Sequence, residues 1–419
     1  MTMQKLMFDV KHRNFQRLWL AQLISQFGDR INQFALIGLI AERNPGSSLG
    51  LAKVFVFTII PVFLIQPFAG VFVDRYDRKT TLFISDLARG FLVLLIPLIF
   101  IDWELMIPVY GIVFCTFCFS RFYVPAKMSI IPDLVSTDNL LQANSLVTTT
   151  GMIAFVLGTA VGGFLIENYG ARMGFLIDSA TFFVSAVFLF SLKVTRKLKI
   201  NTKGIRETAQ KFRQAKKTFF EDIKDGFIYL KNHRELRFIM GTFATLFTAS
   251  GATYVTIIVF VQKTFNSVAR DFSILAVCLG VGMFLGTILY GKLGKKTSGF
   301  KTIFLCLVLG GLMLILFALI TYEIPKLIYA GMLSFGLGLV VGPIFIAANT
   351  LTQLVSDEDK RGKVFSAMEI VTHSFFLAAM LISSWVSQFI HEVFILVAVG
   401  AVVLTVGVLG SLRVKDLEV

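Results

Sequence analysis

Long apolar runs separated by short charged segments are the main pattern along the chain. Each run is about 20 residues long, the length that an α-helix needs to cross the hydrocarbon core of a bilayer. The runs are continuous and do not alternate between apolar and polar positions, which favours helices over the strands of a membrane barrel. The pattern predicts twelve spans, at residues 17–41, 50–73, 80–101, 106–126, 142–166, 173–192, 237–261, 271–290, 302–320, 327–350, 364–390 and 393–412.

Composition and charge add an orientation to this pattern. Of the 419 residues, 56% are hydrophobic and only 16% are charged, whereas about a quarter of the residues of a soluble domain are charged. With the N-terminus inside, the cytoplasmic segments hold 32 of the 40 Lys and Arg residues, as the positive-inside rule requires. We therefore predict a multi-pass protein of the cell membrane (the inner membrane in a Gram-negative cell) with both termini in the cytoplasm.

The net charge of +14 is weak evidence for a nucleic-acid partner. The basic residues are dispersed over short loops and do not form one reading surface, so we expect membrane lipids and no nucleic acid as partners. The N-terminal segment is charged and lacks the apolar core of a signal peptide, so no leader is expected to be removed.

A long polar segment divides the spans six and six. It predicts an N-terminal bundle at residues 1–192, a cytoplasmic linker at 193–236 and a C-terminal bundle at 237–419. Apolar residues recur at helical spacing in the later part of the linker, which predicts an amphipathic helix on the inner membrane surface, either as a tether or as a regulatory element. These residues are Phe212, Phe219, Phe220, Ile223, Phe227 and Leu230.

The two halves repeat each other in places. The segment "PDLVSTDNLLQANSL" (132–146) leads into the fifth span, and "TQLVSDEDKRGKVFSAM" (352–368) leads into the eleventh. The segment "GVFVDRYDRKT" (70–80) has a weaker counterpart in "GKLGKKTSGFK" (291–301). Six plus six helices with an internal repeat is the layout of transporters that rock two bundles about a midplane site. The predicted fold class is an all-α membrane protein with two pseudo-symmetric six-helix bundles.

The segment at 70–80 also resembles the signature between the second and third helices of the major facilitator superfamily. Residues that match it are Gly70, Asp74, Arg75, Arg78 and Lys79, whereas Phe72, Val73 and Asp77 depart from it. Asp77, together with "RNFQRLWLAQLISQFGDR", "PAKMSIIPDLV" and "LLQANSL", is similar to the branch that includes macrolide and siderophore exporters. The resemblance implies the major facilitator fold, secondary transport and a monomer.

In that superfamily the signature acts as an inner gate. Asp74 is expected to cap the third helix or to pair with an Arg when the cytoplasmic side is shut; the alternative is a solvated, positive-inside turn. Asp86 and Arg89 are three apart near the cytoplasmic end of the third span, so they can pair, and we interpret them as mainly structural and joined to the gate. The predicted gate residues are Gly70, Asp74, Arg75, Arg78, Lys79, Asp86 and Arg89.

The first span carries a polar stripe on one helical face. A carboxylate deep in a span is costly unless it is paired or wetted, so the stripe is expected to face the central cavity. Asp29 is predicted to bind a cationic group or a proton, the alternative being a structural hydrogen bond between helices. Arg30 points about 100° away and is expected to meet another helix. The predicted substrate residues are Gln22, Gln26, Asp29, Asn32 and Gln33, with Ser25 on the same face.

Other polar residues within the spans are candidates for proton coupling. Asp178 lies early in the sixth span and is assigned to an outer gate, a proton site or a structural role. Glu369 and His373 are four apart in the eleventh span and form either a proton relay or a hydrogen-bonded pair. Lys127, at the inner mouth of the fourth span, either draws in an anionic head group or marks the cytoplasmic side. The proton-coupling candidates are therefore Asp29, Asp178, Glu369 and His373.

Small residues in the fifth span predict close helix packing at Gly158, Gly162 and Gly163. The drug-antiporter motif at this place has an additional Gly and a Pro where this chain has Ala154 and Thr159, a departure that weakens proton-driven export. Cys115 and Cys118 have a metal-like spacing but are interpreted as small apolar residues, since no His or second Cys pair accompanies them. No metal site and no cofactor are predicted.

Motifs for nucleotide binding and hydrolysis are absent from the sequence, so neither direct use of ATP nor an enzyme is expected. The first functional hypothesis is proton-coupled efflux of a small amphipathic molecule through a Phe-rich pocket, with protons or another ion as the coupling partner. The second is lysophospholipid transport, because the same segments also resemble bacterial lysophospholipid transporters. The third is a ferroportin-like divalent metal exporter, suggested by "GDR" in the first span and by His373. A receptor that does not transport is the alternative of a different class.

Overall fold

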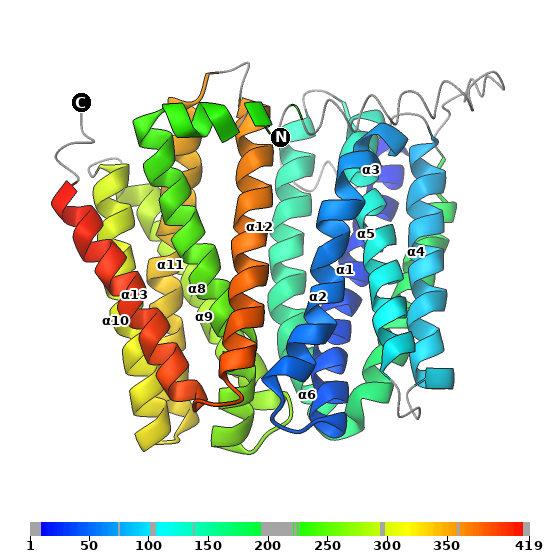
Figure 1. The fold of residues 1–419 in the computed structure, drawn as a ribbon. Helices are drawn as coiled ribbons and strands as arrows, with labels where there is room; N and C mark the ends of the chain where they lie inside the picture. The colour runs from blue at the N-terminus through cyan, green and yellow to red at the C-terminus, as the bar shows by residue number, and fades with distance from the viewer. Residues whose placement is uncertain are drawn as a thin grey trace. The chain divides into compact units, whose positions relative to one another are not determined.

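The structure is a computed structural model that describes residues 10–73, 76–100, 106–136, 139–193, 221, 224–225, 227–293, 298–357 and 361–413. Within these ranges the secondary structure is helical and contains no strand (Figure 1). The first elements are α1 (Val10–Arg43), α2 (Ser48–Leu64), α3 (Gln66–Val73), α4 (Arg78–Leu95), the π-helical turn η2 (Ile96–Phe100), α5 (Ile107–Leu134) and α6 (Leu140–Phe190). The later elements are α8 (Arg234–Phe265), α9 (Arg270–Leu293), α10 (Gly299–Glu323), α11 (Leu327–Val355), α12 (Arg361–Val386) and α13 (Glu392–Arg413).

The described residues group into two compact units. The first unit takes in residues of 1–39 and 54–219, and the second takes in residues of 40–53 and 220–419. The bundle boundaries given from the sequence, at 192 and 237, stay a prediction.

The predicted twelve spans correspond to described helices. Nine helices in the described ranges are long and apolar enough to cross a membrane. One of them, α6, covers both the fifth and the sixth predicted span. The first two predicted spans are not among the nine. Helix α1 is less apolar because of its polar stripe, and the second span is divided between the two shorter helices α2 and α3. The prediction of an all-α membrane protein is confirmed.

A proline explains the division of the second span. Helix α2 ends at Leu64 and α3 begins at Gln66. Pro67 has no N–H group with which to continue the hydrogen-bond ladder of α2, and this favours a break in the helix at this position. The amides of Phe68 and Ala69 instead donate to the carbonyl of Ile65 and start the new helix.

A glycine explains the long helix α6. Gly170 has φ 74° and ψ 171° inside the element, a region of backbone conformation that essentially only glycine adopts. The chain therefore turns at this residue without an intervening loop. Two separate spans were predicted here from the sequence, but so short a connection between them was not.

The start of α4 corrects one prediction on the gate segment. The N-cap is Asp77, whose Oδ2 accepts hydrogen bonds from the amide of Thr80 at 2.8 Å and from the Thr80 hydroxyl at 2.6 Å. The idea that Asp74 caps this helix is therefore wrong, because an N-cap must directly precede the first turn. Asp74 and Arg75 themselves lie outside the described residues.

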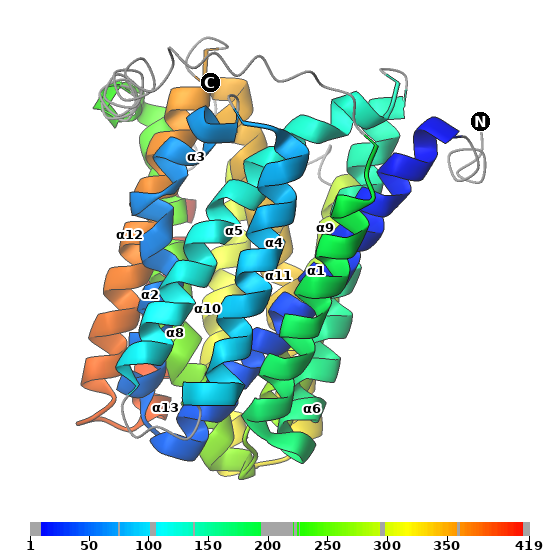
Figure 2. The same cartoon turned by 90° about the vertical axis from the view of Figure 1, so that its right-hand side faces the viewer.

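In the first unit, α4 lies against both α5 and α6 (Figure 2). Arg78 at the start of α4 pairs with Asp133 near the end of α5 at 2.8 Å and donates to the carbonyl of Ser129 at 2.6 Å. Helix α6 also packs on α1, because a Cβ at Gly158 would lie only 2.8 Å from Cβ of Arg30. A Cβ at Gly162 would lie 3.3 Å from Cα of Ile31. These four helices enclose the polar cluster described below.

In the second unit, glycines allow two helix pairs to pack closely. A Cβ at Gly282 or Gly286 of α9 would meet the carbonyls of Phe335 and Leu339 on α11. The contact is reciprocal, since a Cβ at Gly338 or Gly342 of α11 would meet carbonyls of α9. Helices α10 and α13 pack in the same way around Gly311 and Gly400. These four-residue spacings allow close backbone approach in membranes, and they were not among the predictions made from the sequence.

Only the end of the predicted linker helix is described. Residues 227–232 are helical, with the side chain of Leu230 buried and that of Phe227 exposed. The predicted apolar face is therefore split between these two residues. The other members of that face lie outside the described residues: Phe212, Phe219, Phe220 and Ile223.

Candidate functional site

The polar stripe of α1 runs through the first unit. Gln22 is buried and its Nε2 donates to the carbonyl of Val147 on α6 at 3.2 Å. The Ser25 hydroxyl donates to the carbonyl of Gln22. Asp29 differs from these residues, because 40% of its side-chain surface is accessible. The stripe thus contains an accessible carboxylate among buried amides and hydroxyls.

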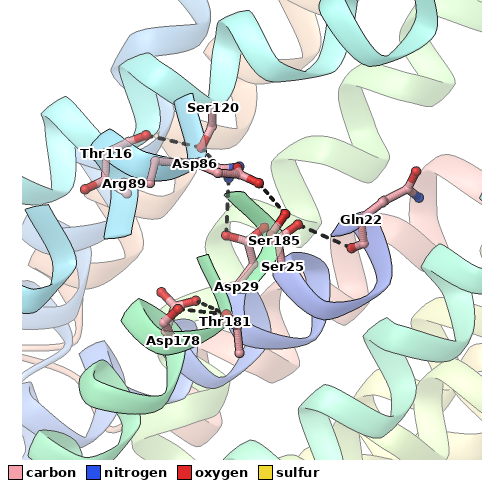
Figure 3. Close-up of polar contacts among 10 residues, drawn as sticks. All are labelled: Gln22, Ser25, Asp29, Asp86, Arg89, Thr116, Ser120, Asp178, Thr181 and Ser185. Carbon is pink, nitrogen blue, oxygen red and sulfur yellow. Dashed lines mark hydrogen bonds and ion pairs between the residues drawn. The ribbon is translucent and has the colours of Figure 1, made fainter. Parts of the chain in front are cut away.

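Arg89 of α4 makes an ion pair with Asp29 (Figure 3). Its side chain is 3% exposed, and its Nη1 lies 3.7 Å from Oδ1 of Asp29. Its Nη2 donates to the carboxylate of Asp86, three residues earlier on the same helix. Arg89 therefore serves two carboxylates, one close and sealed, the other more distant and accessible.

Asp86 is held from two sides. It has no exposed surface, it pairs with Arg89, and its Oδ2 accepts a hydrogen bond from the hydroxyl of Ser185 on α6. A buried charge needs both a counter-charge and hydrogen bonds. Asp86 has both, so it is a fixed counter-ion that keeps Arg89 in place.

Aromatic rings cover the two faces of the Arg89 guanidinium. The Cζ atom lies 4.7 Å from the ring centroid of Tyr123 on α5 and 4.3 Å from that of Phe182 on α6. Both distances are within the range of cation–π attraction. Nη1 also lies 3.4 Å from the hydroxyl of Ser120. Arg89 is therefore positioned by all three neighbouring helices.

Asp178 lies on α6 near the same cluster. It is fully buried, and its Oδ1 accepts a hydrogen bond from the Thr181 hydroxyl at 3.4 Å. Helix α1 approaches it closely, since a Cβ at Gly28 would collide with the side chains of Thr181 and Asp178. Its electrostatic neighbours are Asp29 and Arg89. The structure thus brings two of the four proton-coupling candidates together.

Four buried acceptor atoms in this region have no hydrogen-bond partner among the described residues. They are Oε1 of Gln22, Oε1 of Gln26, Oδ1 of Asn32 and Oδ2 of Asp178. Buried polar atoms in native proteins are nearly always satisfied, so such atoms indicate a place where water, a proton or a ligand group is accommodated. Gln33, by contrast, accepts a hydrogen bond from Arg30 at 3.0 Å.

Arg30 contacts another helix, as expected. Its Cζ lies 4.5 Å from the ring centroid of Phe155 on α6. Asp29 has four cations within electrostatic reach, of which Arg89 interacts most strongly; the others are Arg30, Lys127 and Arg121. The carboxylate of Asp29 thus lies among several positive charges of the first unit.

The predicted gate residues are distributed over two places. Arg78 and Lys79 lie at the start of α4, where Arg78 holds α5 and the Lys79 ammonium lies 5.4 Å from the ring centroid of Phe190. Gly70 lies in α3. Asp86 and Arg89 belong to the cluster with Asp29, and Arg89 is 11 residues, about 16 Å, along α4 from Arg78. Their role in a gate stays a prediction.

The candidates in the second unit lie on α12. Nδ1 of His373 donates to the main-chain carbonyl of Glu369 at 2.8 Å, and the Thr372 hydroxyl donates to the same carbonyl. The His373 ring lies 6.1 Å from that of Phe247 on α8. The contact described between the two candidates is thus made by the backbone of Glu369. The relay through its carboxylate stays a prediction.

Several members of the cluster were not foreseen. Thr116, Ser120 and Tyr123 are among them; with Lys127, which was considered, they follow one another on α5 at spacings of four, three and four, which places them on one face of the helix. Phe182 and Ser185 continue the same kind of series from Asp178 on α6. These spacings are visible in the sequence, but in the fourth and sixth spans only ionisable residues were considered as polar site candidates, and the hydroxyls and rings between them were overlooked.

Comparisons with known proteins place these features in a family. The family model described as Major Facilitator Superfamily matches residues 18–379 and, in a second match, residues 238–417. The chain is 30% identical over 220 residues to the MFS-type transporter YfiS of Bacillus subtilis; this match covers 52% of the chain and 49% of YfiS, so the chain spans about half of that relative. It is 26% identical to the "Putative bacilysin exporter BacE" of Bacillus subtilis, over 75% of the chain and 74% of BacE. It is 22% identical to macrolide efflux protein A of Streptococcus pyogenes, over 67% of each chain.

Solved structures support the same fold. A bacterial homologue of the iron transporter ferroportin superposes with a TM-score of 0.76 at 14% identity, covering 98% of this chain and 100% of that one. The nucleoside transporter NupG superposes with a TM-score of 0.73 at 12% identity, covering 97% and 100%. These neighbours and the relatives indicate a transporter rather than an enzyme. Because the family model matches most of its length, the chain belongs to the Major Facilitator Superfamily.

Proposed function

We propose that the protein exports a small amphipathic molecule from the cell in exchange for protons, with Asp29 as the residue that couples the two. The observation that carries the proposal is the unequal sharing of Arg89, which is paired closely with sealed Asp86 and lies 3.7 Å from accessible Asp29. A buried cation with a permanent partner can lose its second partner at low cost. Asp29 is therefore the carboxylate that changes its state.

Competition at a single carboxylate supplies the coupling. Asp29 can hold a proton or a cationic group of the substrate, but not both at once. Protonation removes the attraction between Asp29 and Arg89, while Asp86 keeps the guanidinium neutralised. Proton entry thus releases the substrate, and proton loss restores the charge for the next cycle. Relatives whose names give bacilysin or macrolide efflux support the outward direction.

The proposal includes the arrangement in the cell. The protein works in the cell membrane as a monomer with both termini in the cytoplasm, because 32 of its 40 Lys and Arg residues then lie inside. All residues of the Asp29 cluster belong to one unit of one chain, so a second copy is not required to complete it.

Lysophospholipid transport is a second candidate. It is favoured by Lys127, a buried cation on α5 near the predicted cytoplasmic end of its span, because an ammonium group attracts the phosphate of a lipid head group. Metal export has no comparable support, since the described residues bring together no group of three or more His, Cys, Asp or Glu side chains that could hold a metal ion.

Transport by reconstituted protein tests the proposal. A thermal-shift screen against drugs, siderophores, lysolipids and divalent metals first identifies a ligand, because a ligand that binds the folded state raises its apparent stability. Export of that ligand from proteoliposomes should require a pH gradient and stop when an uncoupler is added. Asp29→Asn should lower this export at least tenfold and still insert and fold. Glu323→Gln, which removes an exposed carboxylate at the end of α10, is the matched control. Full pH-driven export by Asp29→Asn would exclude Asp29 from the mechanism.

A further inference from the structure

Lys127 of α5 is a buried cation without a direct partner. The residue is 7% exposed. Within the described part of the chain, no hydrogen bond and no ion pair within 4.0 Å is made by its ammonium group. A buried charge is normally paired, because removal from water without compensation is costly. Arg89, another buried cation of the same unit, differs in this respect, because it makes an ion pair and contacts two aromatic rings.

The position of Lys127 connects it to the site. It lies one helical turn after Tyr123, which contacts Arg89, and on the same face of α5. Its electrostatic neighbours are Asp29 and Arg89. The two carboxylates and Arg89 are already associated, so Lys127 is a second positive centre at the edge of the cluster.

Asp29 is the corresponding negative centre that is incompletely paired. Its carboxylate is accessible and lies 3.7 Å from a guanidinium that Asp86 has already neutralised. Oε1 of Gln26, three residues earlier on α1 and so on the same face, is a buried acceptor that has no partner in the described residues. Asp29 and Gln26 together offer acceptors to a group that donates several hydrogen bonds, as an ammonium does.

We propose that this site takes a zwitterion, with the ammonium group of the substrate on Asp29 and Gln26 and its anionic group on Lys127. The charges of Lys127 and Asp29 attract each other but lie beyond ion-pair distance. A ligand with one positive and one negative group can therefore pair with both residues and leave no charge unpaired. A ligand with only a positive group would leave the ammonium of Lys127 without a counter-charge. A ligand with only a negative group would leave Asp29 with Arg89, 3.7 Å away, as its ion-pair partner. This inference rests on the proposed function, since it names the substrate class of the same site.

Two sources supply such a zwitterion. One is a small amino-acid derivative or peptide, with an amine and a carboxylate. The other is a lysophospholipid with an amine-bearing head group. The test therefore uses both, each with analogues from which one charge has been removed.

Binding to the purified full-length protein in nanodiscs tests the charge requirement. The soluble probes are phenylalanyl-leucine, its C-terminal amide, which is a cation, and its N-acetyl form, which is an anion. The lipid probes are lysophosphatidylethanolamine, a zwitterion, and lysophosphatidylglycerol, an anion. We expect the zwitterion of at least one source to bind at least tenfold more tightly than its singly charged analogues, measured from the concentration dependence of the melting temperature.

Variants assign each charge to its residue. Lys127→Gln should remove the preference for phenylalanyl-leucine over its amide and should leave the affinity for the amide within twofold, whereas Lys127→Arg should keep the preference. Asp29→Asn should remove the preference over the N-acetyl form. If the lipid is the substrate source, Lys127→Gln should weaken lysophosphatidylethanolamine at least tenfold. If Lys127→Gln fails to fold, the wild-type comparison of the zwitterions with their analogues decides alone.

The inference is overturned if wild-type protein binds phenylalanyl-leucine and its amide equally and does not prefer the zwitterionic lysolipid. It is also overturned if Lys127→Gln weakens every probe to the same extent. Tetraphenylphosphonium, a lipophilic cation, separates this failure from failure of the proposed function. Transport of that cation that depends on both Asp29 and a pH gradient, with no zwitterion bound, would leave the export proposal standing and remove the anionic subsite.

Discussion

Arg89 makes a close ion pair with Asp86 and lies 3.7 Å from Asp29. The first carboxylate has no exposed surface, whereas 40% of the side-chain surface of the second is accessible. The two ion pairs therefore have different roles. The buried pair with Asp86 fixes the position of the guanidinium, whereas the accessible carboxylate of Asp29 is able to exchange partners. A single arginine thus connects a structural contact with a functional one.

Removal of Arg89 should destabilise the protein strongly. Arg89→Gln removes the counter-charge of buried Asp86, whose other described hydrogen bond comes from the Ser185 hydroxyl, and breaking a buried ion pair from one side costs about 3–5 kcal/mol. The melting temperature of the purified protein should fall accordingly.

The control for this prediction is the double variant. Arg89→Gln combined with Asp86→Asn removes both charges and should recover most of the lost stability, since no uncompensated charge is then left. An Arg89→Gln protein that melts at the wild-type temperature would show that the Asp86–Arg89 pair does not hold these helices together.

The sequence was sufficient for the fold because the physical signal was strong. Apolar runs of membrane length and the asymmetry of basic loops determine the number and order of the spans. The details that it missed depend on single backbone events. Pro67 divides the second span, and Gly170 turns α6 without a loop. Each of these residues is visible in the sequence, but the consequence depends on neighbours that the sequence does not specify.

The site was predictable only in part. The spacing of the α1 stripe identified Asp29, and the three-residue separation identified the Asp86–Arg89 pair. The sequence could not show that Asp29 and the Asp86–Arg89 pair form one cluster. That prediction requires knowing how α1 and α4 pack against α5 and α6. Position along a span also did not reveal that the side chain of Arg89 lies beside Asp29; the assignment of Arg89 to the gate stays a prediction.

Close packing of α9 against α11 should depend on Gly286. Gly286→Ala places a methyl group against the carbonyl of Leu339, and overpacking of this kind costs about 1–3 kcal/mol. The melting temperature should therefore fall. Gly241→Ala on α8 is the matched control, because nothing lies within 4 Å of a Cβ at that position; there the greater helix propensity of alanine should leave stability unchanged or raise it by up to about 1 kcal/mol. Equal melting temperatures for the two variants would contradict the close contact.

The N-cap of α4 should make a measurable contribution to stability. Asp77→Ala removes the acceptor of the Thr80 amide, a change that costs about 1 kcal/mol at such positions. Asp77→Ser and Asp77→Asn retain a capping oxygen and should lie close to wild type in thermal melting. If all three variants melt together, the hydrogen bond to Thr80 does not stabilise the start of the helix.

His373 provides the test of proton coupling in the second unit. Nδ1 of His373 is engaged with the main-chain carbonyl of Glu369. If His373 takes part in coupling, His373→Gln should change the pH dependence of transport, because glutamine keeps a hydrogen-bond donor but cannot titrate. Export should be measured from proteoliposomes between about pH 5 and 8, the range in which histidine side chains change charge.

Ser374→Ala is the control for disturbance of α12. This residue is the neighbour of His373, and among the described contacts its hydroxyl bonds only to the Ile370 carbonyl. An identical pH profile for His373→Gln and wild type would assign the Glu369–His373 pair to helix structure and leave Asp29 and Asp178 as the coupling candidates.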